Sequence, residues 1–553
     1  MIKINKKLTV VGALCLSMLS GCGEKFLTQE NLTEVSTDTY YKNSGEIFEA
    51  LTGVYNALPT EGGRDNPTLV ANVMSDDCFG GGGPDDPDVQ AMDNFQNNVE
   101  NKYAELWGNS YKGIFRVNTI IANFDNSVFE DEEVKNQLLG EAHFLRAFYY
   151  LRLAQFFGEA PLILKPEPTD NPKASADELF GQIALDFKMA IDVMPANKYS
   201  SDMNGRATKW SAEGMMARAF LFYTGKYNKS SIVLSDGSTL TKDQVKTWID
   251  DCIKNSGHDL IDDFRNIWPY SYANEDYAYA KDNNLSWVDD ASGNEEVLFS
   301  IKYSILGAND GNGSLSYSNQ LVLYTAMRGQ DGLLPFGMGW GWGPANADLW
   351  NSYEDGDLRK EGSIISVENP TEGISEDYVW GQWDCFHETG YWNKKYTPIV
   401  VNTLDPDGNT IVKGMFYDLY GSPDDFQTWN IQDEMLLRFS DVLLMAAELG
   451  VNANENFNRV RARAGLGTKD PSLENIKAER RHELAFEGLR YFDLQRWGDA
   501  ETAINKSNGT IVKTRNIDTP YEVNYRPETN GFLPIPESEI RLSGGVLIQN
   551  PGW

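Results

Sequence analysis

The clearest pattern of apolar and charged positions lies near the carboxyl end of the chain, in AERRHELAFEGLRYFDLQRWG between Ala478 and Gly498. Apolar side chains recur there at helical spacing, which predicts a helix. A second stripe of charges repeats between them at steps of three and four: Arg480, Glu483, Glu487, Arg490, Asp493 and Arg496. Because aromatic rings lie beside nearly every charge, we expect these charges to be partly buried and paired. The stretch therefore predicts a central packing helix held by ion pairs, with a structural and not a catalytic role.

Gly488 lies in the middle of this predicted helix, where it costs about 1 kcal/mol relative to Ala unless a neighbouring backbone comes close. The alternative for the whole stretch is a solvated, charged helix face.

Several other segments have the apolar periodicity of helices about one to two dozen residues long. They begin near Ser44 and continue at Tyr103 to Phe124, Val134 to Phe157, Asp177 to Met194 and Lys209 to Tyr223, then at Met435 to Gly450 and Phe457 to Ala464. Their short connections are typical of helical hairpins of the tetratricopeptide kind, although no strict period of about 34 residues is visible. The pattern predicts a mainly α fold.

Residues 228–432 differ from the segments on either side of them. Turn residues, aromatic residues and short β-type runs such as Glu296 to Lys302 alternate there, and long helices are scarce. We therefore divide the chain into a signal segment (1–21), a tether (22–43), a helical region (44–227), an inserted loop-rich, aromatic-rich portion (228–432) and a second helical region (433–553).

An acidic, glycine-rich loop, SDDCFGGGGPDDPD, runs from Ser75 to Asp88 and carries five aspartates. Carboxylates at this density could hold Ca²⁺, but the alternation of ligands in an EF-hand loop is absent. We expect a solvated loop and leave calcium binding open.

Charge and composition narrow the function further. The formal net charge of −33 argues against a nucleic-acid partner, because phosphate recognition requires clusters of Lys and Arg. The 4 histidines are scattered, and the 3 cysteines after Cys22 are widely spaced. These spacings predict neither a metal site nor a disulfide framework, and nothing suggests a cofactor.

The amino terminus has the features of a lipoprotein signal. Lys3, Lys6 and Lys7 precede an apolar run that is too short to span a bilayer, and Leu19-Ser20-Gly21-Cys22 follows. A small residue before a cysteine resembles the bacterial lipobox, so we expect cleavage before Cys22 and acylation of that residue. Two or more acyl chains would hold the mature protein stably on a membrane.

Eight pieces of the chain, in this order, resemble the SusD/RagB family of outer-membrane lipoproteins from Bacteroidetes. They are the lipobox with CGEKFL, TDTYYKNSGEIFEALTGVYNAL, GEAHFLRAFYYLRLAQFFGEAPLI, RATKWSAEGMMARAFLF, GWGPANADLWNSYEDGDLR, LLRFSDVLLMAAE, ERRHELAFEGLRYFDLQRWG and the terminal LPIPESEIRL with QNPGW. Together they span essentially the whole mature chain.

The resemblance implies a body of four tetratricopeptide-like hairpins with a loop-rich portion packed against it. It also implies a lipid-anchored, surface-exposed outer-membrane protein that binds glycans, or in some members peptides. Such a protein passes its ligand to a SusC-like TonB-dependent transporter.

A sugar presents an apolar C–H face ringed by hydroxyls, so its binder needs flat aromatic rings next to polar side chains. Rings in Gly-rich or irregular segments are the best candidates, because a core role is less automatic there. These are Trp340 in GMGWGWG, and Trp380 and Trp383 in VWGQWD; Tyr324, Tyr270 and Tyr272 are further candidates. The resemblance adds Trp107 and Asn109. Core packing is the alternative for each ring, most of all for Trp342.

Two other classes of function remain open. A glycoside hydrolase needs two carboxylates, but with 81 acidic residues some pair always lies at a suitable distance, and no HExxH, GxSxG or P-loop signature occurs. A purely structural helical adaptor would bind one membrane partner and no small ligand. We expect a binding protein without catalytic activity.

Overall fold

The computed structural model describes residues 40–59, 64–96, 101–167, 171–273, 275–289, 293–304, 318–329, 334–374, 378, 382, 384–421 and 425–553. The predicted signal segment and Cys22, the predicted acylation site, lie outside the described residues, as do Trp380 and Trp383.

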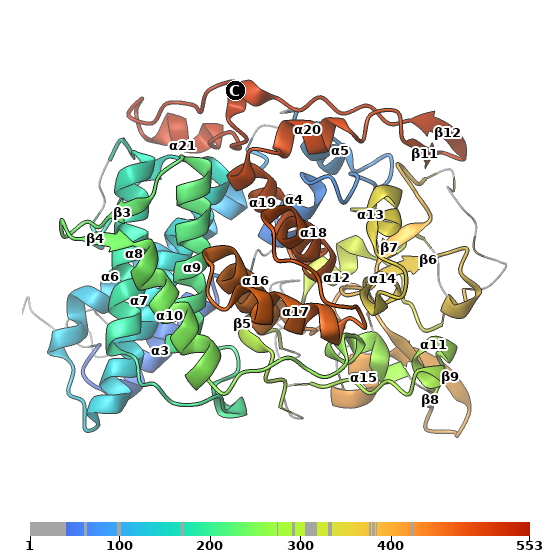
Figure 1. Cartoon of the computed structure of the whole chain (residues 1–553), viewed down its shortest axis with the longest axis horizontal. Helices are drawn as coiled ribbons and strands as arrows, with labels where there is room; N and C mark the ends of the chain where they lie inside the picture. The colour runs from blue at the N-terminus through green and yellow to red at the C-terminus, as the bar shows by residue number, and fades with distance from the viewer. Residues whose placement is uncertain are drawn as a thin grey trace, which may run out of the picture.

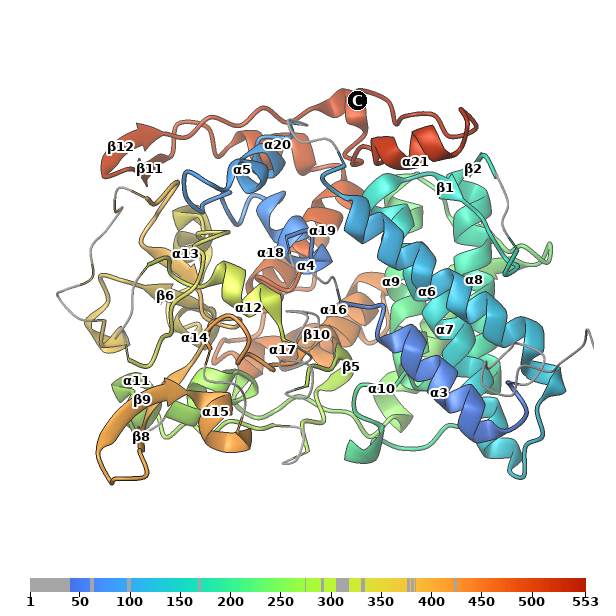
Figure 2. The same cartoon turned by 180° about the vertical axis from the view of Figure 1, so that it is seen from behind.

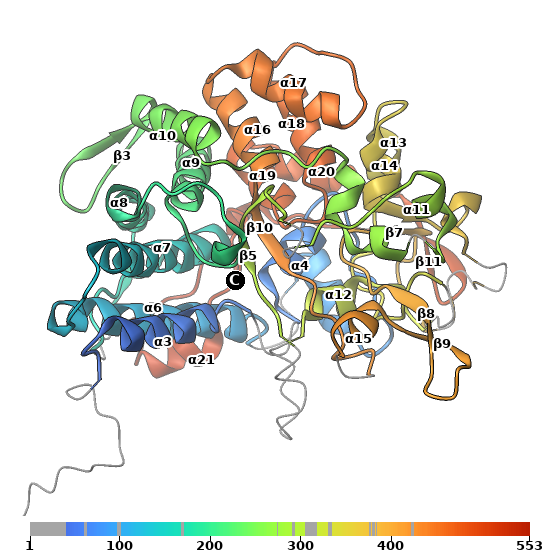
Figure 3. The same cartoon turned by 90° about the horizontal axis from the view of Figure 1, so that it is seen from below.

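Long helices stack side by side in one half of the molecule (Figures 1 and 3). They are α3 (Ser44–Tyr55), α6 (Ala104–Asn123), α7 (Glu132–Phe157), α8 (Ala176–Val193), α9 (Lys209–Lys226) and α10 (Lys242–Asn255), continued by α16 (Phe439–Leu449) and α17 (Ala453–Arg463). From α6 onward, each helix packs against the next one in this order. The mainly α fold of packed helical hairpins is confirmed.

Local sequence explains where several of these helices begin. Helices α8, α9 and α10 each begin with a full capping box, at Ser175, Thr208 and Thr241. The capping side chain accepts from the amide three residues later, and the side chain of that later residue (Glu178, Ser211 or Gln244) accepts from the amide of the capping residue. Such caps satisfy amide groups that the first turn leaves unpaired.

The other half of the molecule is built from short elements. Its short helices, together with those that border it, are α4 (Pro67–Val73), α5 (Pro87–Asp93), α11 (Ala278–Asp282), α12 (Gln320–Thr325), α13 (Ala347–Ser352), α14 (Leu358–Ser363), α15 (Met415–Tyr420) and α20 (Ala500–Asn505). Figure 2 shows this half from behind, with α12 and α15 on the same flank. The short helix α21 (Glu537–Leu542) lies instead beside the long helices (Figures 1 and 3).

All strands within the described residues form antiparallel pairs of two. The pairs are β1 (Ala160–Pro161) with β2 (Lys173–Ala174), β3 (Ser231–Val233) with β4 (Thr239–Thr241), β5 (Val297–Ile301) with β10 (Glu434–Arg438), β6 (Ile364–Ser366) with β7 (Tyr391–Asn393), β8 (Val400–Leu404) with β9 (Thr410–Gly414), and β11 (Ile511–Thr514) with β12 (Ile517–Pro520). The β5–β10 pair joins a strand inside residues 228–432 to one that begins just after them.

Two elements differ from the sequence prediction. The stretch from Met435 to Gly450 is not one helix, because its first residues pair with β5 as strand β10 and only then continue into α16. Helix α10 lies inside residues 228–432, yet it packs against α9 and α16 and so extends the helical body. The domain boundaries themselves stay predictions.

The charged stretch from Ala478 to Gly498 is also broken, and the prediction of a single helix there is wrong. Helix α18 (Leu473–Glu483) ends before a turn, and α19 (Arg490–Trp497) begins after it. In the turn, Gly488 has a φ of 72°, and a Cβ atom there would lie 2.9 Å from the Cα atom of Thr68. The close approach of a neighbouring backbone therefore explains this glycine.

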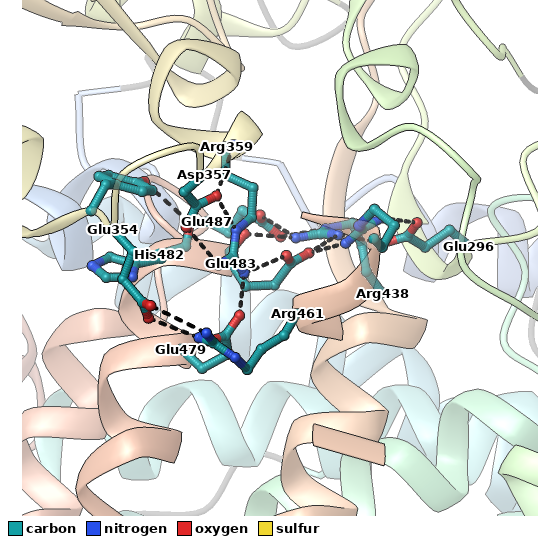
Figure 4. Close-up of polar contacts among 12 residues, drawn as sticks. Glu296, Glu354, Asp357, Arg359, Arg438, Arg461, Glu479, His482, Glu483 and Glu487 are labelled. Atoms are coloured by element: carbon teal, nitrogen blue, oxygen red, sulfur yellow. Dashed lines mark hydrogen bonds and ion pairs between the residues drawn. The ribbon is translucent and has the colours of Figure 1, made fainter. Parts of the chain in front are cut away.

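The six charges of this stretch are paired, as predicted: five are buried and Arg490 is half-buried. Figure 4 shows the contacts of two of them, Glu483 and Glu487. Arg438 contacts Glu296, Glu483 and Glu487 at 2.5, 3.0 and 2.7 Å, and the side chains of Arg438, Glu296 and Glu483 are 0% exposed. The Arg359 guanidinium lies 3.2 Å from Glu483. We call these five residues the ion cluster.

The ion cluster joins segments that are far apart in sequence. Glu296 precedes β5, Arg438 ends β10, Glu483 ends α18 and Arg359 belongs to α14. Burial would raise the pKa of Glu483, but the positive charges of Arg463, Arg438 and Arg359 outweigh it and lower that pKa. The Glu483 carboxylate is thus held ionised by the arginines and acts as their structural partner.

The acidic loop is buried from residue 75 to residue 83, so the expectation of a solvated loop is wrong for this part, whereas Asp85 is exposed. Asp76 and Asp77 are 7% and 2% exposed. The Arg490 Nε atom lies 2.7 Å from an Asp76 oxygen, and the Arg481 Nε atom lies 2.7 Å from an Asp77 oxygen. The arginines of α18 and α19 therefore bind the loop to the centre of the molecule.

These buried pairs predict a loss of stability in acid. Burial alone would raise the pKa of Asp441, but Arg480 and Arg218 lower it to about 2, against an ordinary value of 3.8. A depressed folded-state pKa contributes stability above about pH 4 that is lost as the pH falls toward about 2. For Asp441 the loss should be roughly 2 kcal/mol. Denaturant titrations at pH 5 and pH 2.5 should show it, with a smaller change in Asp441→Asn. An equal change in both proteins would contradict the assignment.

Candidate functional site

Two glycine-rich segments lie backbone against backbone at the centre of the loop-rich half. The Gly82 amide donates to the Gly341 carbonyl at 2.7 Å, and the Gly343 amide donates to the Gly80 carbonyl at 3.0 Å. A Cβ atom at Gly81 would lie 2.3 Å from the Gly341 oxygen. Side chains at these positions would keep the segments apart, so the glycines are needed for this contact.

The GMGWGWG segment also lies against the short helix α12. The Trp340 amide donates to the Leu323 carbonyl at 3.0 Å, and the Trp342 amide donates to the Tyr324 carbonyl at 2.7 Å. The side chain of Trp342 is 0% exposed, whereas that of Trp340 is half-buried. The expected core role of Trp342 is confirmed, and Trp340 keeps part of its ring at the surface.

Charged groups surround Trp340. The Arg328 Nη1 atom donates to the Trp340 carbonyl at 3.1 Å and to an Asp86 oxygen at 3.2 Å, and its Nε atom lies 3.5 Å from an Asp384 oxygen. The ring centroid of Phe426 lies 6.3 Å from that of Trp340. The arrangement places an accessible aromatic ring beside a guanidinium group and two carboxylates.

Tyr324 lies on the inner side of this group. It is 9% exposed, and its ring centroid lies 4.6 Å from that of Trp342. Its hydroxyl is hydrogen-bonded to the guanidinium group of Arg64, and Lys102 Nζ lies 5.9 Å from the Trp342 ring. Burial raises the pKa of the Tyr324 hydroxyl, so this group is a neutral hydrogen-bonding partner at physiological pH.

Trp380 and Trp383 lie outside the described residues, and their part in the site stays a prediction. Asp384, which follows them in the sequence, contacts Arg328. Gln382 is half-buried, and its carbonyl accepts a hydrogen bond from the Cys385 amide at 2.9 Å. Asp384, which directly follows Trp383 in the sequence, therefore contacts Arg328, the arginine beside Trp340.

Trp107 and Asn109 lie in α6 and have other partners. The Trp107 ring is 2% exposed and meets Phe157 edge to face at a centroid distance of 5.0 Å. The Asn109 side chain donates to the Pro59 carbonyl at 3.2 Å. A buried ring offers no face to a sugar in this structure, so we leave both residues out of the site proposed below.

Tyr270 is completely buried, and its hydroxyl donates to the Gly362 carbonyl at 2.9 Å. The hydroxyl of the half-buried Tyr272 donates to an Asp418 oxygen at 3.3 Å. Neither ring contacts the group around Trp340.

The side chains of the buried Asp93 and of His387 accept hydrogen bonds from backbone amides of the glycine segment at Gly80 and Gly81. The Gly80 amide donates to an Asp93 oxygen at 2.6 Å, and Asp93 lies 4.0 Å from His387 Nδ1. Burial raises the pKa of Asp93 to about 7 and lowers that of His387 to about 4. The Gly81 amide is 3.4 Å from His387 Nδ1, so both side chains orient backbone groups of this loop.

A cavity of about 390 Å³ lies away from Trp340, between the start of α7, residues 195–208 and β5. Its tryptophan, Trp210, is 2% exposed and donates its Nε1 proton to the Asn197 carbonyl at 2.6 Å. Phe299, also in its wall, is 1% exposed. These two rings pack in the protein interior, whereas Tyr199, also in the wall, is half-buried with its ring centroid 4.8 Å from that of His258. Among its described lining residues the cavity thus has one partly open ring and, unlike the surroundings of Trp340, no partly open tryptophan, so its size alone does not make it the better candidate.

No cluster of three or more His, Cys, Asp or Glu side chains in the described part of the chain could hold a metal ion. No described helix is both long enough and apolar enough to cross a membrane.

Comparison with known proteins identifies the family. Residues 266–553, more than half of the chain, match the model described as "SusD family". The chain belongs to the SusD family. Residues 30–221 match a second model, described as "Starch-binding associating with outer membrane". The resemblance predicted from the eight motifs is confirmed.

Curated SusD-like relatives cover nearly the whole chain. "SusD-like protein P2" of Formosa agariphila is 23% identical, in an alignment that covers 99% of this chain and 100% of the relative. A "SusD-like protein" of Bacteroides ovatus is 24% identical over 89% of this chain and 83% of its own.

Solved structures of SusD-like glycan-binding proteins share the fold. A "Laminarin binding SusD-like protein" aligns with a TM-score of 0.72 and 25% identity, over 93% of this chain and 100% of its own. "Surface glycan-binding protein A from Bacteroides fluxus" aligns with a TM-score of 0.72 and 26% identity over the same shares. The mainly α, SusD-like architecture is therefore established for this chain.

Proposed function

We propose that this SusD-family protein binds an oligosaccharide or polysaccharide at the outer surface of the cell, without cleaving it. The observation that carries this proposal is the similarity over 93% of the chain to two SusD-like structures whose names describe a laminarin-binding and a surface glycan-binding protein.

The surroundings of Trp340 fit this function chemically. The half-buried indole ring supplies an apolar platform for the C–H face of a sugar. Arg328 and Asp384, beside it, supply donors and acceptors for the hydroxyl groups. We include Trp380 and Trp383 in the proposed site because they flank Gln382 in the segment that leads to Asp384, and Tyr324 because it supports the Trp342 ring behind Trp340.

A panel titration tests the proposal. The purified mature protein should bind at least one of laminari-oligosaccharides, malto-oligosaccharides or their parent polysaccharides in calorimetry or affinity gels. Binding to peptides with none to any glycan would favour peptide capture. Release of shorter products from a labelled polysaccharide would instead show an enzyme.

We further propose that acylation of Cys22 anchors the protein to the outer membrane and that a SusC-like TonB-dependent transporter receives the ligand. Copurification of the lipidated chain with a large outer-membrane barrel would support this partnership. Retention of the chain in the soluble fraction after Cys22→Ala would support the anchor.

The ion pairs of α18 and α19 should affect stability and not ligand recognition. Arg490→Ala removes the closer of the two arginine partners of the buried Asp76, so we expect a loss of about 1–3 kcal/mol in the free energy of unfolding. The affinity of the folded protein for its glycan should stay unchanged. A selective loss of affinity, with little loss of stability, would show that this structural interpretation is wrong.

A further inference from the structure

A second group of aromatic side chains lines a pocket of about 230 Å³ between α15, residues 287–289 and residues 431–433. The Trp287 ring centroid lies 6.1 Å from that of Phe416, nearly perpendicular to it. The ring of Phe416 stacks with that of Tyr420 at 6.2 Å and an interplanar angle of 19°. Three rings from two segments therefore form one aromatic wall.

Exposure of the outer rings distinguishes this pocket from a packed core. Tyr420 is 45% exposed and Trp287 is half-buried, whereas Trp268 and Trp342 are 0% exposed. Large rings are costly to leave in water unless they have a use. Tyr420 and Trp287 thus have open faces in a concave site, the property that distinguishes Trp340 from Trp342.

Polar groups border the aromatic wall. The Tyr420 hydroxyl donates to an Asp289 oxygen at 3.2 Å, and Lys302 pairs with Asp433 at 2.5 Å. Carboxylates can accept several hydrogen bonds each, and an ammonium group donates three. Aromatic faces with donors and acceptors at their edge match the two surfaces of a sugar ring.

The volume suits one small unit and not a whole oligosaccharide. Pockets that enclose drug-sized ligands measure roughly 300–1,000 Å³, so about 230 Å³ is sized for a single ring.

One short segment connects this pocket to the Trp340 site. Phe426 lies beside Trp340, and Ile431 lines the pocket. Five residue steps limit the distance between their Cα atoms to at most about 18 Å. Asn319, which caps α12, donates to the Gln432 carbonyl at 2.8 Å and so fixes the segment between the two groups. Helices α12 and α15 lie on the same flank in Figures 2 and 3.

We propose that the pocket between α15, residues 287–289 and residues 431–433 is a second sugar-binding subsite, which takes a further unit of the glycan chain held at Trp340. This inference rests on the proposed glycan-binding function. It predicts that affinity depends on the length of the glycan, because only a glycan long enough to reach from the Trp340 ring to this pocket gains the second contact.

Titrations with laminari-oligosaccharides and malto-oligosaccharides of two to eight units test the subsite. Tyr420→Ala and Trp287→Ala should each weaken binding of the longest bound oligosaccharide about tenfold, and binding of the shortest bound one less than twofold. Trp340→Ala should weaken both. Tyr417→Ala is the matched control, because this half-buried tyrosine of α15 lies near Lys413 and does not line the pocket, and it should leave every affinity unchanged.

The outcomes separate the two proposals. If Trp340→Ala weakens binding while Tyr420→Ala and Trp287→Ala change no affinity at any length, the subsite is wrong and the proposed function stands. If no oligosaccharide of either series binds the wild-type protein, the proposed function and the subsite both fail. Binding of apolar peptides that is lost in Tyr420→Ala would assign the pocket to a peptide instead. Because Tyr420 is 45% exposed, its variant should stay close to the wild-type melting temperature even if Trp287→Ala is less stable.

Discussion

Replacing Arg438 with methionine is expected to lower the free energy of unfolding by about 3–5 kcal/mol, because it removes the one cation that contacts all three buried carboxylates. Arg463, Arg359 and Lys395 then remain as their only cationic partners among the described residues. The Arg438 guanidinium contacts Glu296, Glu483 and Glu487, and its side chain is 0% exposed. Methionine keeps the volume and removes the charge, so the loss reports the ion cluster and not a cavity. Guanidinium titrations of both proteins at pH 7 measure it.

Arg459→Met is the matched control for this substitution. Arg459 also pairs with an aspartate, Asp259, at 2.6 Å, but the two side chains are 32% and 57% exposed. Exposed pairs contribute about 0–1 kcal/mol, so this variant should be nearly as stable as the wild type. Equal losses in the two variants, or no loss in Arg438→Met, would contradict a structural role for the ion cluster.

Replacing Trp340 with alanine is expected to weaken glycan binding about 30-fold or more. Truncation of an aromatic anchor at the centre of a binding site costs about 2 kcal/mol or more, and each 1.4 kcal/mol is a factor of ten. The melting temperature should fall by only a few degrees, since the Trp340 ring is half-buried. Calorimetry with the tightest oligosaccharide of the panel measures the effect, and the triple variant with Trp380→Ala and Trp383→Ala should abolish retention in affinity gels.

Trp248→Ala provides the control for the loss of a tryptophan as such. Trp248 is also partly buried, but it lies on α10 in the helical body. Its variant should bind the glycan with wild-type affinity. A Trp340→Ala protein that folds and binds normally would remove Trp340 from the site.

The sequence predicted the long helices well because their signals are local. Capping boxes begin α8 and α9, and the apolar periodicity of α6 is strong. Helix α10 also begins at a capping box, but it lies in residues 228–432, where few long helices were predicted. The buried charges of residues 478–498 were also predictable, because aromatic rings are interleaved with them.

The turn between α18 and α19 was not predictable, because its cause is distant in sequence. The Asn72 side chain donates to the Phe486 carbonyl and accepts from the Gly488 amide, both at 2.9 Å. Phe486 itself has a φ of 66°, a conformation that a phenylalanine rarely adopts without such partners. A distant partner also shortened the helix predicted from Met435 to Gly450. Its first residues pair with β5 as strand β10, and the helix begins only at Phe439.

Only part of the candidate site could be predicted. Trp340 and Trp342 are two residues apart and would point to the same side of a regular strand, but Gly341 has a φ of 73° and changes the direction of the chain between them. Gly341 was therefore a local sequence signal that the chain turns between the two tryptophans. No pattern indicated that Arg328 and Phe426 come to lie beside Trp340, or that Trp107 would be buried against Phe157.

The most direct test of the account is a crystal structure of the protein with its tightest oligosaccharide. We expect a sugar ring stacked on the Trp340 indole, with hydroxyl groups bonded to Arg328 or Asp384, and the ion cluster without contact to the ligand. An oligosaccharide bound in the cavity between α7 and β5, or against the carboxylates of the ion cluster, with Trp340 uncovered, would contradict it.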